Sequence, residues 1–63
     1  MQRLLNAHHP LTGDTPLIIA ARSGNKEAVS ILLKNGADAT LENESGESAL
    51  DVAAPETKRV IMG

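Results

Sequence analysis

The sequence of 63 residues contains no cysteine and no Phe, Tyr or Trp. The lack of cysteine excludes a disulfide framework and any thiolate metal site, so we expect an intracellular setting, in the cytoplasm or the nucleus. Without aromatic side chains, the core has to consist of Leu, Ile, Val and Ala, and the large anchors that dominate many protein interfaces are missing. A chain of this length forms at most one small domain, close to the limit of stability.

Basic residues are in the minority, since 6 Lys and Arg stand against 8 Asp and Glu and give a net charge of −2. A nucleic-acid binder normally needs a basic excess on one face, so we expect no nucleic-acid partner. The sequence has no apolar run of about 18 residues, the length of a membrane-spanning helix, so we expect no membrane partner. The beginning of the chain, MQRLLNAHHP, is too short and too polar for a signal peptide.

What the sequence does contain is an internal repeat. A shift of 33 residues aligns GDTPLIIAA, which begins at Gly13, with GESALDVAA, which begins at Gly46, in one register without gaps. A fixed period of about 20 to 50 residues is typical of proteins built from stacked repeats.

Each copy of the repeat predicts a pair of short helices. Thr15 followed by proline is typical of a helix start, so we predict a helix over residues 16–23 that ends at Gly24. A second helix is predicted over residues 26–35, ending at Gly36. Its apolar residues have the spacing of one inward-facing stripe, formed by Ala28, Val29, Leu32 and Leu33. We expect the following segment to form an extended loop or a β-hairpin.

This order of helix, tight turn, helix, Gly-Ala-Asp and hairpin resembles the ankyrin repeat family. The resemblance rests mainly on TPLIIAARSGNKEAVSILLKNGADA, residues 15–39, and it covers residues 10–54. It implies an all-α repeat fold, an α-solenoid of helix-turn-helix units joined by hairpin loops. Residues 10–42 would form one complete repeat, between the tail of a preceding repeat at 1–9 and a partial or capping C-terminal repeat at 43–63.

The sequence departs from the family pattern in several places. The family's TPLH reads TPLI at Thr15–Ile18 and SALD at Ser48–Asp51, so the histidine that bonds around the turn is absent both times. The last unit lacks the glycine between its helices, and we expect Pro55 to end one helix and open the next. Only seven residues separate Leu5 from Gly13, so we expect a first hairpin that is shortened or absent.

By this resemblance the chain is a protein-protein interaction module without catalysis or a cofactor, which binds its partner through the concave surface of hairpins and first helices. The positions that would contact the partner are Leu11, Thr12, Asp14, Arg22, Ser23, Glu42, Glu44, Ser45, Glu47 and Glu56. The acidic excess on the second hairpin favours a partner with a basic segment.

Two alternatives stay open beside this interpretation. The chain could be a regulatory or accessory segment of a larger protein, including an enzyme, or it could self-associate through apolar repeat ends. We expect no catalysis by these residues themselves. His8 and His9 are adjacent rather than four residues apart on a helix, and they lack further zinc ligands. Glu42, Glu44 and Glu47 are expected in a solvated loop, where no burial prepares a carboxyl group for acid catalysis.

Overall fold

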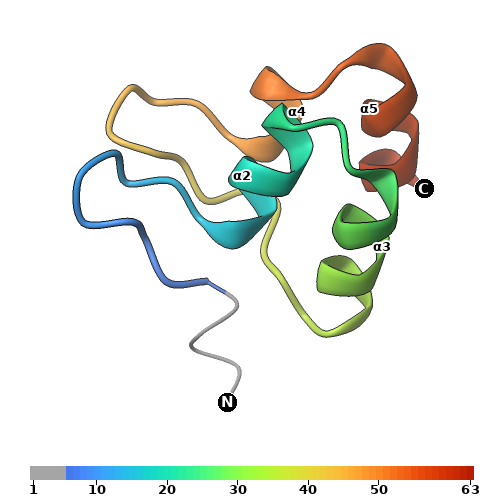
Figure 1. Cartoon of the computed structure of the whole chain (residues 1–63), viewed down its shortest axis with the longest axis horizontal. Coiled ribbons are helices and arrows are strands. Elements are labelled where there is room, and N and C mark those ends of the chain that lie inside the picture. Colours follow the sequence, from blue (N-terminus) through green and yellow to red (C-terminus); the bar gives the residue numbers. More distant parts are fainter. Residues whose placement is uncertain (1–5) are drawn as a thin grey trace.

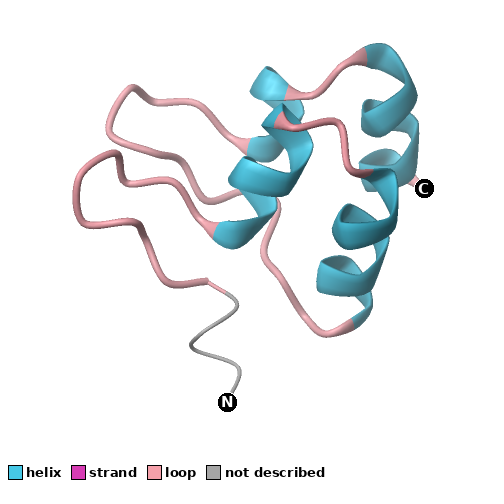
Figure 2. Ribbon diagram, viewed as in Figure 1, coloured by secondary structure: helices cyan, strands magenta, loops and turns pink. Residues whose placement is uncertain are grey.

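The computed structural model describes residues 6–63, which contain four helices and no strand. The helices are α2 (Pro16–Arg22), α3 (Lys26–Lys34), α4 (Ala49–Val52) and α5 (Pro55–Met62). They form two helix pairs, and α2 packs on both α3 and α4 while α3 packs on α5 (Figure 1). Two loops extend away from the helices on one side (Figure 2). The predicted helical repeat fold is therefore confirmed, whereas residues 1–5 of the expected tail of a preceding repeat lie outside the described residues.

The ends of α2 follow from local hydrogen bonds. The hydroxyl oxygen of Thr15 accepts a hydrogen bond from the N–H of Ile18 at 3.2 Å, and Pro16 occupies the first helical position. At the other end, the N–H of Gly24 donates to the carbonyl of Ala21 at 3.1 Å. The predicted helix is confirmed to within one residue, because Ser23 is the cap that follows the last helical residue.

The second helix pair forms without a glycine between its helices. The N–H of Ser48 donates to the Asp51 carboxylate at 2.8 Å, which caps the start of α4. Asp51 stands where the family motif has histidine, so a carboxylate bonds around this turn instead. Ala53 and Ala54 are extended, and Pro55 is the first residue of α5. Pro55 therefore opens α5 as predicted, whereas α4 already ends at Val52.

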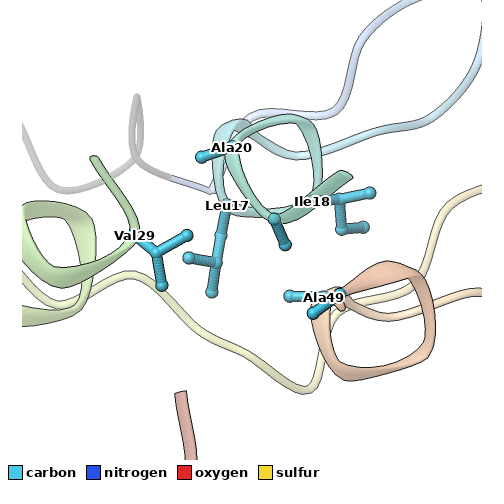
Figure 3. Packing of buried hydrophobic residues seen from close by; sticks show 7 residues of the cluster. Leu17, Ile18, Ala20, Val29 and Ala49 are labelled. Atoms are coloured by element: carbon cyan, nitrogen blue, oxygen red, sulfur yellow. The ribbon is translucent and has the colours of Figure 1, made fainter. Parts of the chain in front are cut away.

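The core lies between α2, α3 and α4 (Figure 3). In Figure 3, Leu17 points from α2 toward Val29 of α3, and Ile18 points toward Ala49 of α4. Ile18 occupies the other histidine position of the family motif and is 0% exposed, so an apolar side chain fills this place. The full set of buried apolar residues is Leu17, Ile18, Ala20, Ala21, Val29, Ala49 and Ala53.

The apolar stripe of α3 faces the core less completely than the sequence predicted. Val29 is 0% exposed, but its stripe neighbours are only partly buried against the core, namely Ala28, Leu32 and Leu33. Ile31 lies off the stripe and is 60% exposed. The helix therefore depends on Val29 more than on its leucines. No helix among residues 6–63 has the length and apolar character needed to cross a membrane.

Candidate functional site

The two loops that precede α2 and α4 lie side by side (Figure 1). We call residues 8–14 the first loop and residues 42–48 the second loop. The N–H of Glu44 in the second loop donates to the carbonyl of Thr12 in the first loop at 3.2 Å. Gly13 has a φ of +76°, and a Cβ there would lie 2.8 Å from the Glu44 nitrogen. Glycine is therefore required at this position for both its backbone conformation and the close approach of the loops.

Each loop is closed by a turn of its own. In the first loop the N–H of His9 donates to the carbonyl of Asp14 at 2.7 Å, and the N–H of Gly13 donates to the carbonyl of His9 at 2.8 Å. In the second loop the N–H of Asn43 donates to the carbonyl of Glu47 at 2.9 Å. The first loop thus forms a turn, so of the two expected alternatives, a shortened or an absent first hairpin, only the absent one is excluded.

Four polar side chains connect the two loops with the end of α2. Arg22 donates to the carboxylate of Asp14 at 2.5 Å and lies 3.5 Å from that of Glu47. The side-chain amide of Asn43 donates to Asp14 at 2.9 Å and to Glu47 at 3.0 Å. We call these four residues, Asp14, Arg22, Asn43 and Glu47, the polar network. Glu47 was expected in a solvated loop, and the structure adds that its carboxylate also contacts Arg22 and Asn43.

The network fixes the charge of its central carboxylate. Asp14 is only 5% exposed. The hydrogen bond from Arg22, followed by that from Asn43, lowers the pKa of Asp14 from 3.8 to about 2. The same hydrogen bond to Asp14 raises the pKa of Arg22. Asp14 is therefore ionised at neutral pH, and its charge is matched by a guanidinium in direct contact.

An open hollow of about 420 Å³ lies against both loops and the end of α2. Its lining consists of Leu11, Thr12, Asp14, Arg22, Asn43, Glu44, Ser45 and Glu47. The structure thus brings together seven of the ten positions expected to contact a partner. Leu11 is 81% exposed at this hollow and offers an apolar contact beside the carboxylates.

The other three positions lie elsewhere. Glu42 lines a second hollow of about 370 Å³, whose remaining lining residues are His8, His9, Pro10, Gly13, Asn43 and Glu44. Ser23 is exposed at the end of α2, and Glu56 is exposed in the first turn of α5. Neither of these two residues lines either hollow.

The two histidines are bound into the first loop. The Nδ1 atom of His8 is 2.7 Å from the carbonyl oxygen of Gly13, and the Nδ1 atom of His9 accepts from the N–H of Leu11 at 3.0 Å. Within residues 6–63, no three His, Asp or Glu side chains gather in a way that could hold a metal ion. What the described surface offers is a set of fixed hydrogen-bonding groups and carboxylates around an exposed leucine, which suits binding.

Asn43 is the residue of this candidate site that sequence reasoning missed. The sequence marked it only as a turn residue, but its side-chain oxygen accepts from the N–H groups of Ser45 and Glu47, each at 2.9 Å. Its amide meanwhile reaches Asp14, which is 29 residues away. The available signal was the 33-residue period, because it places the second loop in register with the first.

Comparisons with known proteins identify the family of the chain. The family model described as ankyrin repeats (3 copies) matches residues 1–61. Ankyrin repeat and SOCS box protein 11 of Homo sapiens is 48% identical over 44 residues, which are 70% of this chain and 14% of that protein. Oxysterol-binding protein-related protein 1 of Rattus norvegicus is 40% identical over 52 residues, which are 81% of this chain and 6% of that protein.

A plant relative aligns along the whole chain. Protein LHCP TRANSLOCATION DEFECT of Oryza sativa subsp. japonica is 39% identical over 64 residues, which are 100% of this chain and 36% of that protein. No solved structure matches the chain. The chain spans far less than two thirds of each of these three relatives. Because the family model matches nearly every residue, the chain belongs to the ankyrin repeat family.

Proposed function

We propose that this chain binds a partner protein through the surface formed by the first loop, the second loop and the end of α2. Ankyrin repeats are generally protein-protein interaction modules, and this proposal assigns that role to a particular surface. The observation that carries it is the hollow of about 420 Å³, which collects seven of the ten expected contact positions.

The charges on this surface favour a basic segment of the partner. Asp14 and Glu47 are paired with Arg22, whereas Glu42 and Glu44 form no salt bridge within the described residues. Both glutamates are exposed, and Glu44 is part of the lining of both hollows. Exposed carboxylates on a rim speed the encounter with a basic partner and disfavour an acidic one.

A photo-crosslinking experiment tests the location of the surface. A photoreactive leucine analogue at Leu11 should capture a partner from a cell extract, and the same analogue at the exposed position Lys34 serves as the control. The captured protein is then identified, purified and measured for binding. Crosslinks that form equally well from both positions would show that the loop surface is not the binding site.

The purified partner then tests the role of charge. Glu44→Gln should slow association and reduce its dependence on salt, because a rim charge acts mainly on the encounter rate. Glu27→Gln removes an equal charge from an exposed position on α3 and should leave association unchanged. If both variants associate at the rate of the unmodified chain, the proposal of a basic segment is wrong. The location of the binding surface is then decided by the crosslinking experiment alone.

Self-association is a second candidate function, because large apolar side chains are exposed away from the loops. Ile19 is 46% exposed, Ile31 is 60% exposed and Met62 is 75% exposed. Like chains that stacked through such faces would bury these side chains. Sedimentation equilibrium over a range of concentrations tests this, and Ile31→Glu and Met62→Glu should each reduce association. A monomer at every concentration excludes the candidate.

A role as an accessory segment of a larger protein is compatible with binding through the same surface. The named relatives are all much longer than the span they share with this chain. In that setting the loop surface would hold a partner, or another part of the same protein, and the crosslinking experiment would identify which of the two it contacts.

A further inference from the structure

Asn35 and Gly36 form the only Asn-Gly pair in the sequence. The side-chain carbonyl of an asparagine is open to attack by the backbone nitrogen of the next residue, and a following glycine has no Cβ to obstruct that attack. Both residues are exposed, directly after the last residue of α3. The chain has three other asparagines, Asn6, Asn25 and Asn43. Each of them is followed by a residue with a side chain.

In the folded chain the reacting groups are held in other hydrogen bonds. The N–H of Gly36 donates to the carbonyl of Leu33 at 3.1 Å, and the N–H of Ala37 donates to that of Leu32 at 2.9 Å. This pair of bonds is the Schellman motif that closes many helices, with Gly36 at a φ of +96°. The amide nitrogen of Asn35 itself donates to the carbonyl of Ile31 at 2.7 Å.

The backbone angle of Asn35 also opposes the reaction. Ring closure requires the Gly36 nitrogen and the Asn35 Cβ to be nearly eclipsed about the Cα–C bond. At the observed ψ of 10° the nitrogen is turned away from Cβ. The last turn of α3 therefore has to open before the two groups can meet.

We propose that Asn35 is a spontaneous deamidation site whose rate is controlled by opening of the last turn of α3. In the opened turn the Gly36 nitrogen forms a bond with Cγ of Asn35 and gives its proton to water. The bond between Cγ and Nδ2 breaks, and Nδ2 takes up a proton from water and leaves as ammonia. Water then opens the cyclic imide at one of its two carbonyls, which yields aspartate or isoaspartate. Water is the only co-reactant.

Neither product restores the end of the helix. A carboxylate has no N–H to donate to the carbonyl of Ile31, and its negative charge lies at the end of α3 where the helix dipole disfavours it. Isoaspartate also adds a methylene group to the main chain, which displaces Gly36 and Ala37 from the carbonyls that they reach now. One reaction thus weakens α3 permanently, and α3 supplies Val29 to the core.

The test measures the formation of aspartate and isoaspartate at each asparagine at neutral pH. Peptide mass mapping locates the modified asparagine, and a methyltransferase specific for isoaspartate labels that product. One sample contains trimethylamine N-oxide, which favours the folded chain, and the other contains urea, while circular dichroism records the folded state of both. We expect Asn35 to be modified faster than the other asparagines. Its modification should be at least about tenfold slower in the folded sample than in urea, which corresponds to about 1.4 kcal/mol of opening free energy. Equal rates in the folded and unfolded samples would overturn the proposal, as would faster modification at Asn25.

Two variants separate chemistry from stability. Val29→Ala leaves the Asn-Gly pair intact but loosens α3, so it should accelerate the reaction in the folded sample and not in urea. Asn35→Asp imitates one product and should lower the urea midpoint, whereas Asn35→Gln keeps an amide and should lower it less. An unchanged rate in Val29→Ala, or an unchanged midpoint in Asn35→Asp, contradicts the proposal.

Discussion

Gly13 and Glu44 belong to neighbouring loops, and a Cβ on Gly13 would lie 2.8 Å from the nitrogen and 2.9 Å from the Cγ of Glu44. Gly24 has a similar backbone conformation, with a φ of +72°, but open space where its Cβ would be. The two glycines therefore separate the effect of backbone strain from that of crowding.

Gly13→Ala should destabilise the chain more than Gly24→Ala. An alanine with positive φ costs about 1 to 2 kcal/mol at either position. At Gly13 the contact with Glu44 has to be relieved as well, which separates the loops. Urea unfolding followed by circular dichroism measures both variants against the unmodified chain. Equal losses of stability would mean that the loops are not in close contact in solution.

Val29→Ala should be the most damaging single truncation in α3. Its side chain is completely buried, and full burial of a valine contributes about 1.5 to 3 kcal/mol. Ile31→Ala is the control, because this side chain is 60% exposed and should change the free energy of unfolding by about 0.5 kcal/mol or less. Leu32→Ala should fall between them, since Leu32 is only partly buried. Thermal or urea unfolding of the three variants gives the order, and a larger loss for Ile31→Ala would contradict the packing.

Acid should weaken the fold partly through Asp14. Its pKa is about 2 in the folded chain against 3.8 ordinarily, so the folded state favours the ionised form. This contribution is fully present above about pH 4 and is lost as the pH falls through about 2, because the unfolded chain binds the proton first. Asp14→Asn removes the titrating group and should make the urea midpoint less dependent on pH in that window. The midpoint of both chains is measured at several pH values, and identical slopes would exclude Asp14 as a source of acid sensitivity.

The sequence predicted the features that depend on neighbouring residues. The hydroxyl of Thr15 and the ring of Pro16 begin α2 where expected, and Pro55 opens α5, because caps and proline act within one turn of helix. The 33-residue period likewise predicted that two similar units would follow each other. The resemblance to ankyrin repeats added the positions expected to contact a partner, and these stay a prediction.

The sequence did not predict which loop side chains meet. The bond between Asn43 and Asp14 joins residues 29 positions apart, and nothing local to either residue marks the other as its partner. Glu47 was expected with Glu42 and Glu44 in a solvated loop, since only the folded arrangement brings Arg22 beside it. The degree of burial along α3 also depends on how α2 and α5 pack against it. The spacing of apolar residues within α3 does not determine that packing.

The polar network has a consequence for how this surface can change. The network holds the loops in one arrangement, so a partner bound as proposed would not have to order them, and the entropy loss on binding would be smaller. Leu11 and Ser45 line the same hollow, but their side chains lie outside the network. Substitutions at these two positions would change what the surface recognises without disturbing the arrangement of the loops. The same fold could therefore come to bind different partners.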